Sequence, residues 1–297
     1  MEKNVNVLIL RTAGTNCDQE TAFAFKSCGA HVERVHIKSL STTKDLLDQY
    51  HILAIPGGFS YGDDIASGKI LANELRLQLT DQLQRFVSEG KLIIGICNGF
   101  QILVKAGILP GSLTDQEKSH PFSQTTTLTH NDSGRFEDRW VHLKVQNKSV
   151  WTDGITKILS VPVAHGEGKF IPKDQHVLDQ LKKNGQIALR YCHGDGGQAQ
   201  GYPDNPNGSI DDIAGITDIS GRVLGLMPHP ERHFLFTHHP HWTRLKKTGP
   251  LGDGAKIFEN GIRYVRKHLL GGLDESKGYN QDDREGRLVS YNNKGKP

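Results

Sequence analysis

The sequence predicts an α/β fold in which a mostly parallel central sheet carries helices on both faces and gains antiparallel strands in its later part. Short, uninterrupted apolar runs alternate with segments of helical spacing in the first third of the chain. That alternation is typical of strands buried on both faces and joined by crossover helices. After Gly111 alternating runs such as 140–145 and 186–191 replace it, which indicates further strands of mixed direction in the same sheet.

The expected elements follow the chain in order. The early strands are expected at 5–10, 31–36, 51–55 and 91–96, and the helices between them at 17–28, 43–49 and 68–89. The late elements are a strand at 223–227 and an amphipathic helix at 255–269. We therefore expect one domain over 1–270. Residues 271–297 are polar and rich in Gly and Asn, which predicts a mobile tail.

The composition excludes several classes of protein. Hydrophobic residues make up 36% of the 297 residues and charged residues 23%, the balance of a folded globular protein. The net charge of +3 is spread along the chain without a basic block, so we expect no nucleic-acid partner. No apolar stretch is long enough to span a membrane. The first residues lack a signal-peptide pattern and the four cysteines form no CxxC pair, so we expect a cytoplasmic protein with free thiols.

The strongest chemical signal is Gly95-Ile96-Cys97-Asn98-Gly99, between an apolar strand and a helical run. This is the pattern of a nucleophile elbow with Cys in place of Ser. Glycines two residues to either side remove side chains that would collide at the sharp turn. The amides and dipole of the following helix favour a thiolate, the form of cysteine that attacks carbonyl carbons. The sequence therefore predicts Cys97 as a nucleophile.

Two alternatives to this interpretation stay open. Cys97 could be an ordinary buried residue at a tight turn, because free cysteine is among the most buried residue types. Cys17 is a rival nucleophile, but it lies in a polar loop and lacks the elbow. Cys28 and Cys192 are expected at a helix end and a strand end, without a catalytic part.

A thiol nucleophile needs a base, and the base needs a group that orients it. The segment Met227-Pro-His-Pro-Glu-Arg-His233 follows a strand and offers both. Its prolines hold the backbone extended, so that His229 and Glu231 project to the same side. Without Cys97 the same segment would be interpreted as a rigid turn with solvated side chains.

Residues 56–63, PGGFSYGD, follow a buried strand and lack the lysine of a phosphate loop. We expect the backbone N–H groups of Gly58 and Asn98 to form an oxyanion hole beside the nucleophile. The alternative is a plain glycine turn. The histidine-rich segment 233–242 could suggest a metal site, but its irregular spacing favours a solvated loop, and we expect no metal.

Six motifs together resemble one known family. They are PGGFSYGD at 56–63, GICNGFQ at 95–101, HNDSGRFEDRW at 130–140, VAHGEGKF at 163–170, YPDNPNGS at 202–209 and MPHPERH at 227–233. In this order they resemble the glutaminase subunits of phosphoribosylformylglycinamidine synthase, an enzyme of purine biosynthesis. The opening RTAGTNCDQET, 11–21, is similar as well. The resemblance implies a flavodoxin-like class I glutamine amidotransferase fold.

The resemblance also implies roles for individual residues. It implies a Cys-His-Glu triad of Cys97, His229 and Glu231 that hydrolyses L-glutamine to glutamate and ammonia. Substrate contacts would fall on Gln101, His165, Gly166 and Glu167. Residues near the interface with a synthetase would be Asn131, Ser133, Arg135 and Phe136. The segment 112–130 and the tail do not match the family motif by motif.

The implied partner is a separate synthetase subunit that binds ATP, magnesium and the ribonucleotide, with room for a small accessory subunit. No cofactor is expected in this chain. Two other functions remain open at this point: a freestanding cysteine hydrolase or peptidase on the same fold, and a regulatory or scaffolding subunit without turnover.

Overall fold

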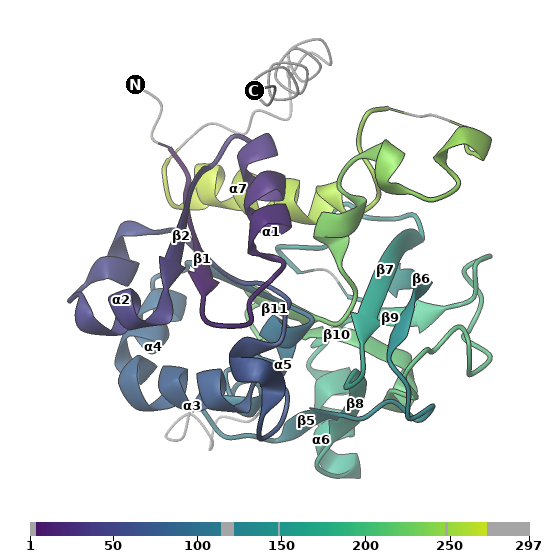
Figure 1. Ribbon diagram of the computed structural model, residues 1–297, viewed down its shortest axis with the longest axis horizontal. Coiled ribbons are helices and arrows are strands. Elements are labelled where there is room, and N and C mark those ends of the chain that lie inside the picture. Colours follow the sequence, from purple (N-terminus) through teal and green to yellow (C-terminus); the bar gives the residue numbers. More distant parts are fainter. Residues whose placement is uncertain (1–3, 114–121, 148, 247–248, 272–297) are drawn as a thin grey trace.

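The computed structural model describes residues 4–113, 122–147, 149–246 and 249–271 (Figure 1). Its main sheet has the strand order β2-β1-β3-β4-β11-β10-β9-β6-β7. These strands are β1 (Asn6–Arg11), β2 (His31–His36), β3 (Ile52–Ile55), β4 (Leu92–Ile96), β6 (Glu137–Val145), β7 (Leu159–His165), β9 (Ile187–Cys192), β10 (Ile213–Thr217) and β11 (Val223–Leu226). The predicted fold class is confirmed.

The first five strands of this order are parallel, and the other four join antiparallel. Every residue of β3, β4 and β11 is buried, because helices cover both faces of this part of the sheet. β2 lies at the edge and carries four polar residues among its six, with most side chains exposed. The carboxyl ends of the neighbouring strands β4 and β11 therefore lie side by side, which decides where the site forms.

Helices α1 (Asp18–Ser27) and α7 (Ala255–His268) pack together on one side of the sheet, while α3 (Lys69–Gln78) and α5 (Asn98–Lys105) pack together on the other (Figure 1). The helix predicted at 68–89 is two helices, α3 and α4 (Thr80–Ser88), which meet at Leu79 with φ −127°.

The helix predicted at 43–49 is wrong in its position. The structure has α2 (Ile37–Thr42) and then a short 3-10 turn over Leu46–Gln49. The His36 side chain accepts a hydrogen bond from the Lys38 amide and starts α2 early. Asp45 then adopts φ 56°, which no helix accommodates.

A small second sheet supports the loops around the site. It pairs β5 (Thr126–Thr129) with β8 (Lys169–Pro172), antiparallel. The HGEG segment, residues 165–168, joins β7 of the main sheet to β8 of the small one. One of its ends is therefore fixed by each sheet. The remaining helix, α6 (Gln175–Lys183), begins with the Asp174 carboxylate accepting from the Val177 amide.

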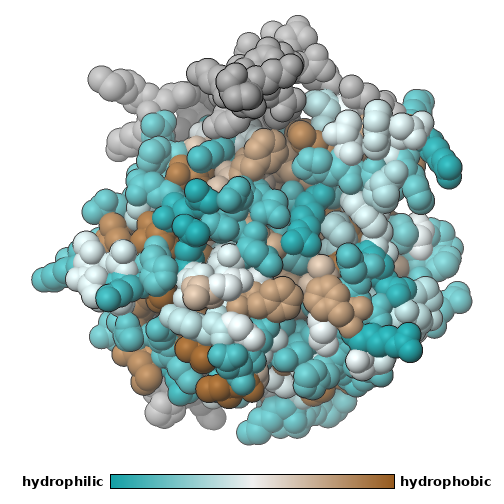
Figure 2. Space-filling view, in the orientation of Figure 1, coloured by the Kyte–Doolittle hydropathy of each residue, from teal (hydrophilic) through white to brown (hydrophobic). Residues whose placement is uncertain are grey.

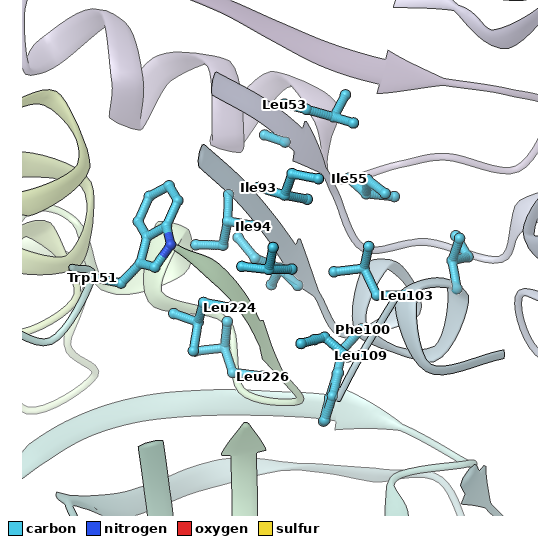
Figure 3. Close-up of a cluster of buried hydrophobic side chains, with 14 of the residues drawn as sticks. Leu53, Ile55, Ile93, Ile94, Phe100, Leu103, Leu109, Trp151, Leu224 and Leu226 are labelled. Atoms are coloured by element: carbon cyan, nitrogen blue, oxygen red, sulfur yellow. The ribbon is translucent and has the colours of Figure 1, made fainter. Parts of the chain in front are cut away.

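The hydrophobic core lies on both faces of the parallel strands (Figure 3). The labelled residues are Leu53, Ile55, Ile93, Ile94, Phe100, Leu103, Leu109, Trp151, Leu224 and Leu226. Trp151 is fully buried, and its indole N–H donates to the Arg222 carbonyl at 2.8 Å. On α7, a Cβ at Gly261 would lie 2.6 Å from the Trp151 ring, so the helix approaches the indole directly.

Membrane-spanning helices are not found in the described ranges, where no helix has the length and apolar character that a bilayer requires. The predicted tail at 271–297 lies outside the described residues except for Gly271. The predicted domain over 1–270 stays a prediction.

Candidate active site

Cys97 lies between β4 and α5 with φ 53° and ψ −107°, a strained conformation for a residue with a side chain. Its amide donates to the Leu226 carbonyl at the end of β11. Backbone carbonyl groups lie too close to the flanking glycines, Gly95 and Gly99, to leave room for a side chain at either position. A Cβ at Gly95 would lie 2.6 Å from the Gly99 carbonyl oxygen, and one at Gly99 would lie 1.8 Å from the Ile55 carbonyl oxygen. The predicted elbow is present in the structure.

His229 follows β11, the strand next to β4. Its amide donates to the Pro162 carbonyl at 2.8 Å, and its Nδ1 lies 2.6 Å from Oε1 of Glu231. Both side chains are about 1% exposed. With Glu231 accepting the Nδ1 proton, Nε2 is the nitrogen left to exchange a proton, and it has no hydrogen-bond partner among the described residues. The predicted pairing of base and orienting carboxylate is therefore geometrically in place.

The side chains of His229, Cys97 and Cys17 converge on Gly57. A Cβ at Gly57 would lie 2.8 Å from Cε1 of His229, 3.4 Å from Cβ of Cys97 and 3.1 Å from Sγ of Cys17. Burial acts to lower the pKa of His229, but the Glu231 carboxylate and the Cys97 sulfur outweigh it and hold that pKa well above its ordinary value. The site thus favours a protonated imidazole beside the nucleophile.

The two predicted oxyanion donors are the chain neighbours of two residues of this cluster, since Gly58 follows Gly57 and Asn98 follows Cys97. The Gly57 carbonyl accepts from the amides of Asn16 and Cys17 at 3.4 and 3.2 Å. Because the peptide is planar and trans, the Gly58 N–H points away from that loop, and in the part of the chain described here it has no backbone acceptor. Asn98 is the first residue of α5, whose leading amides are not used within the helix.

Cys17 lies in the loop before α1, as expected. Its burial was not predicted: it is 1% exposed and lies beside His229. Its sulfur accepts from Nη2 of Arg232 at 3.1 Å and donates to Oδ1 of Asn16 at 3.1 Å. The only sequence signal was its place in the motif at 11–21. Arg232 and Gly57 were also missed as neighbours of the site.

The HGEG segment is shaped by Asn131. The Asn131 amide group donates to the His165 carbonyl at 2.8 Å, and its Oδ1 accepts from the Gly168 amide at 2.9 Å. Asn131 itself is 3% exposed. Of the four residues expected near an interface, it instead forms the turn that carries Gly166 and Glu167.

The His165 side chain points into the protein. Its Nδ1 lies 3.1 Å from Oδ1 of Asn131, and Nε2 lies 3.5 Å from Nδ2 of Asn207. Burial lowers the pKa of His165 to about 3, with a further contribution from nearby His229. His165 is therefore neutral at physiological pH, and it is the backbone of this segment that faces the site's other residues.

Gln101 joins the elbow helix to the same segment. Its Oε1 accepts from the Asn98 side chain at 3.0 Å, and its Nε2 donates to the Glu167 carbonyl at 2.5 Å. Oε2 of Glu167 lies 3.8 Å from Nζ of Lys105, whose pKa is lowered by burial. Both polar ends of Gln101 are thus occupied within the protein, and they fix Glu167 next to the elbow.

The surface near the site is polar with two exposed aromatic rings. Ser133, Arg135 and Phe136 are exposed, as the interface interpretation requires. Phe136 is 52% exposed and its ring centroid lies 6.4 Å from that of Phe59, which follows Gly58. Figure 2 shows hydrophilic residues over most of the face that it presents, with hydrophobic ones in small groups. A partner would therefore meet a small aromatic surface in polar surroundings.

One group of side chains in the described ranges could ligate a metal ion: Cys17, His229 and Glu231. The histidine-rich segment 233–242 contributes no such group. There His233 and His239 instead pack their rings against Trp140, with centroids 5.0 and 4.6 Å apart.

Comparisons with known proteins show what this chain is similar to. Residues 4–265 match the model of the CobB/CobQ-like glutamine amidotransferase domain. Phosphoribosylformylglycinamidine synthase subunit PurQ of Dehalococcoides mccartyi is 48% identical over 89% of this chain and 98% of that protein. The PurQ subunit of Methanococcus maripaludis is 42% identical over 88% and 98%. The structure of PurLQS from Thermotoga maritima superposes with a TM-score of 0.65 at 30% identity, covering 89% of this chain and all of that one.

Proposed function

This chain belongs to the CobB/CobQ-like glutamine amidotransferase family, and from that membership we propose that it is the glutaminase subunit of phosphoribosylformylglycinamidine synthase. It is a class I glutamine amidotransferase that hydrolyses glutamine and supplies ammonia for purine biosynthesis. Relatives of this name match nearly their whole length. The observation that carries the proposal is the convergence of Cys97 and His229 on Gly57, with Glu231 bonded to the imidazole.

In the proposed mechanism, the Cys97 thiolate attacks the amide carbon of glutamine. The oxyanion that forms accepts hydrogen bonds from the amides of Gly58 and Asn98. Protonated His229 gives its Nε2 proton to the leaving nitrogen, and ammonia departs. A γ-glutamyl thioester remains on the sulfur.

The second half of the reaction uses the same imidazole as a base. His229, now neutral at Nε2, takes a proton from water, and the water oxygen attacks the thioester carbon. Glutamate leaves and the Cys97 thiolate returns with the imidazolium. The proton on Nδ1 of His229 stays on that nitrogen throughout, because Oε1 of Glu231 accepts its 2.6 Å hydrogen bond and so holds the ring in one tautomer.

We propose that the HGEG segment binds the α-amino and carboxylate groups of glutamine through His165, Gly166 and Glu167. The bonds of Asn131 and Gln101 to this segment support that role, because they hold its backbone at the elbow. Gln101, which was expected to contact glutamine directly, would then act on the substrate through Glu167.

The proposal includes a separate synthetase subunit as partner, which would bind ATP, magnesium and the ribonucleotide, and a small accessory subunit. The similarity of this chain to the structure of PurLQS from Thermotoga maritima supports an assembly of this kind. The exposed ring of Phe136 would lie at the contact. We also propose a cytoplasmic location, since all four cysteines are free thiols.

The test compares Cys97→Ala with the unsubstituted chain, each assembled with its synthetase. Cys97→Ala is expected to abolish glutamine-dependent synthesis and leave ammonia-dependent synthesis intact, because only the nucleophile is removed. Equal loss of both activities would contradict the division of roles. Full glutaminase turnover by the isolated chain, unaffected by the synthetase, would instead favour a freestanding hydrolase.

A further inference from the structure

The side chain of Asn98 links the two segments that carry the proposed oxyanion donors. Asn98 is the first residue of α5 and directly follows Cys97. Its Oδ1 accepts a hydrogen bond from the Ser60 amide at 3.3 Å. Ser60 lies two residues after Gly58, in the loop that follows β3. One side chain therefore ties the loop of the first donor to the helix of the second.

The other end of the Asn98 side-chain amide is fixed as well. Its Nδ2 donates to Oε1 of Gln101 at 3.0 Å and to Oδ1 of Asp63 at 3.4 Å. The Gln101 amide is itself oriented, because its Nε2 donates to the Glu167 carbonyl and its Oε1 is left to face Asn98. Only the NH₂ end of Asn98 can serve two acceptors, so its oxygen end has to face the Ser60 amide.

Burial keeps these hydrogen bonds in place. Asn98 is 2% exposed and Gln101 is 3% exposed, and a buried amide that loses a partner is left unsatisfied at a cost in free energy. On its other side the same loop is held by the segment before α1, where the Phe59 amide donates to the Gly14 carbonyl at 2.9 Å. The Asn98 bond adds a link toward the elbow, which the contact with Gly14 does not provide.

We infer that Asn98 is, through its side chain, a positioning residue that holds the Gly58 and Asn98 amides at the spacing which one oxyanion can bridge. The proposed mechanism uses only the backbone N–H of Asn98, so the side chain has a second and separate task. Donors stabilise an oxyanion only when they are aimed at the same point. Both polar ends of the side chain are occupied within the protein, so its effect should appear in the chemical step. The inference rests on the proposed glutaminase function.

The first experiment compares Asn98→Ala with the unsubstituted chain, each assembled with its synthetase. Asn98→Ala keeps the backbone amide at this position and removes the side-chain bonds to Ser60 and Gln101. We expect kcat for glutamine hydrolysis to fall by about 10- to 100-fold, since a misaimed donor costs less than a deleted one. KM for glutamine should change by less than about threefold, because substrate binding before the chemical step does not use the oxyanion donors.

Asn260→Ala is the matched control. Asn260 is 1% exposed, and its Nδ2 donates to the carbonyls of Trp151 and Asp153 at 2.9 and 2.8 Å. It lies on α7, across the sheet from α5. Asn260→Ala therefore also removes a buried amide with its hydrogen bonds, and it should keep the unsubstituted kcat. A similar fall in kcat in Asn98→Ala and Asn260→Ala would overturn the inference, because kcat would then follow general destabilisation.

The second experiment measures alkylation of Cys97 by iodoacetamide, followed by mass spectrometry of the Cys97 peptide. The thiolate displaces iodide at a saturated carbon, so the reaction needs the ionised sulfur but forms no oxyanion. Asn98→Ala should therefore alkylate Cys97 within about twofold of the unsubstituted rate, although its kcat is reduced.

Two outcomes of these measurements contradict the inference. An unchanged kcat in Asn98→Ala would show that the side chain does not position the donors. Equal losses of alkylation rate and kcat would place the defect at the thiolate or in the fold. If the unsubstituted complex alkylates at Cys97 but hydrolyses no glutamine, the proposed function is refuted, and the inference falls with it.

Discussion

Gly57 and His229 lie so close that a Cβ atom at residue 57 would come within 2.8 Å of the imidazole Cε1. The same Cβ would lie 3.4 Å from Cβ of Cys97. The glycine therefore sets how near the imidazole and the nucleophile can come to each other. Any side chain at this position has to push one of them away.

Gly57→Ala is expected to lower kcat for glutamine hydrolysis by about 10²-fold, because a misplacement of about 1 Å has a cost of that order. KM should change little, since the three atoms nearest to a Cβ at Gly57 belong to His229, Cys17 and Cys97 and none to the HGEG segment. Steady-state kinetics give both values. Gly249→Ala is the control, because a Cβ there meets nothing within 4 Å. Equal activity of the two variants would show that the spacing is not critical.

Glu231→Gln removes the negative charge that raises the pKa of His229. Burial then dominates, so the imidazolium is lost at a lower pH and the alkaline limb of the pH profile of kcat/KM should move to lower pH. We also expect kcat to fall by about 10³-fold or more, because the ring loses its fixed tautomer. An alkaline limb at the same pH in both proteins would contradict the assignment of Glu231.

His165 should make folding stability depend on pH. Its pKa is about 3 in the folded protein because of burial, and about 6.5 when unfolded. The unfolded chain therefore binds more protons between these values, and stability is lost as the pH falls through this window. From pH 7 to pH 4 the loss is on the order of 3 kcal/mol.

Urea denaturation at pH 7 and pH 4 checks this expectation by comparing the unsubstituted chain with His165→Gln. The difference in unfolding free energy between the two pH values should shrink in His165→Gln, whatever its stability at pH 7. Substitution of the exposed His176 by Gln should leave this difference in unfolding free energy unchanged. If His165→Gln and His176→Gln behave alike, His165 is not the group responsible.

Trp151→Ala is expected to destabilise the protein by about 3–5 kcal/mol, the range for deleting a large buried side chain. The indole is fully buried, and its N–H bond to the Arg222 carbonyl would be lost as well. Thermal or urea unfolding measures the change. Trp242, which is 44% exposed, provides the control: Trp242→Ala should stay within about 0.5 kcal/mol. Similar losses at both positions would argue against the core described here.

The centre of the parallel half could be predicted because β3, β4 and β11 are short apolar runs without a polar residue. β3 and β4 are buried at every position, a pattern that loops do not show. The helix break at Leu79 could not be predicted, since no proline or glycine marks it. Leu79 is fully buried, so packing against the rest of the protein decides the break.

The candidate site could be predicted where backbone geometry leaves a pattern in the sequence. The glycines around Cys97 are a pattern of this kind. The prolines around His229 misled, because the backbone was expected to be extended and instead forms a 3-10 helix over Pro230–His233. The placement of Cys17 depends on contacts with Gly57 and Arg232, which are distant in sequence. A polar loop that folds over a glycine turn buries its thiol without any local signal, and so the burial of Cys17 beside His229 could not be predicted.

The sheet brings the proposed nucleophile and base together from neighbouring strands that are far apart along the chain, β4 and β11, with Gly95 opposite Gly225. During synthesis, the ribosome completes the segment carrying Cys97 long before the one carrying His229. A nascent or prematurely terminated polypeptide would contain Cys97 but lack His229, the proposed base. Such fragments should leave the cell's glutamine untouched, so nitrogen is released only once a whole chain has folded.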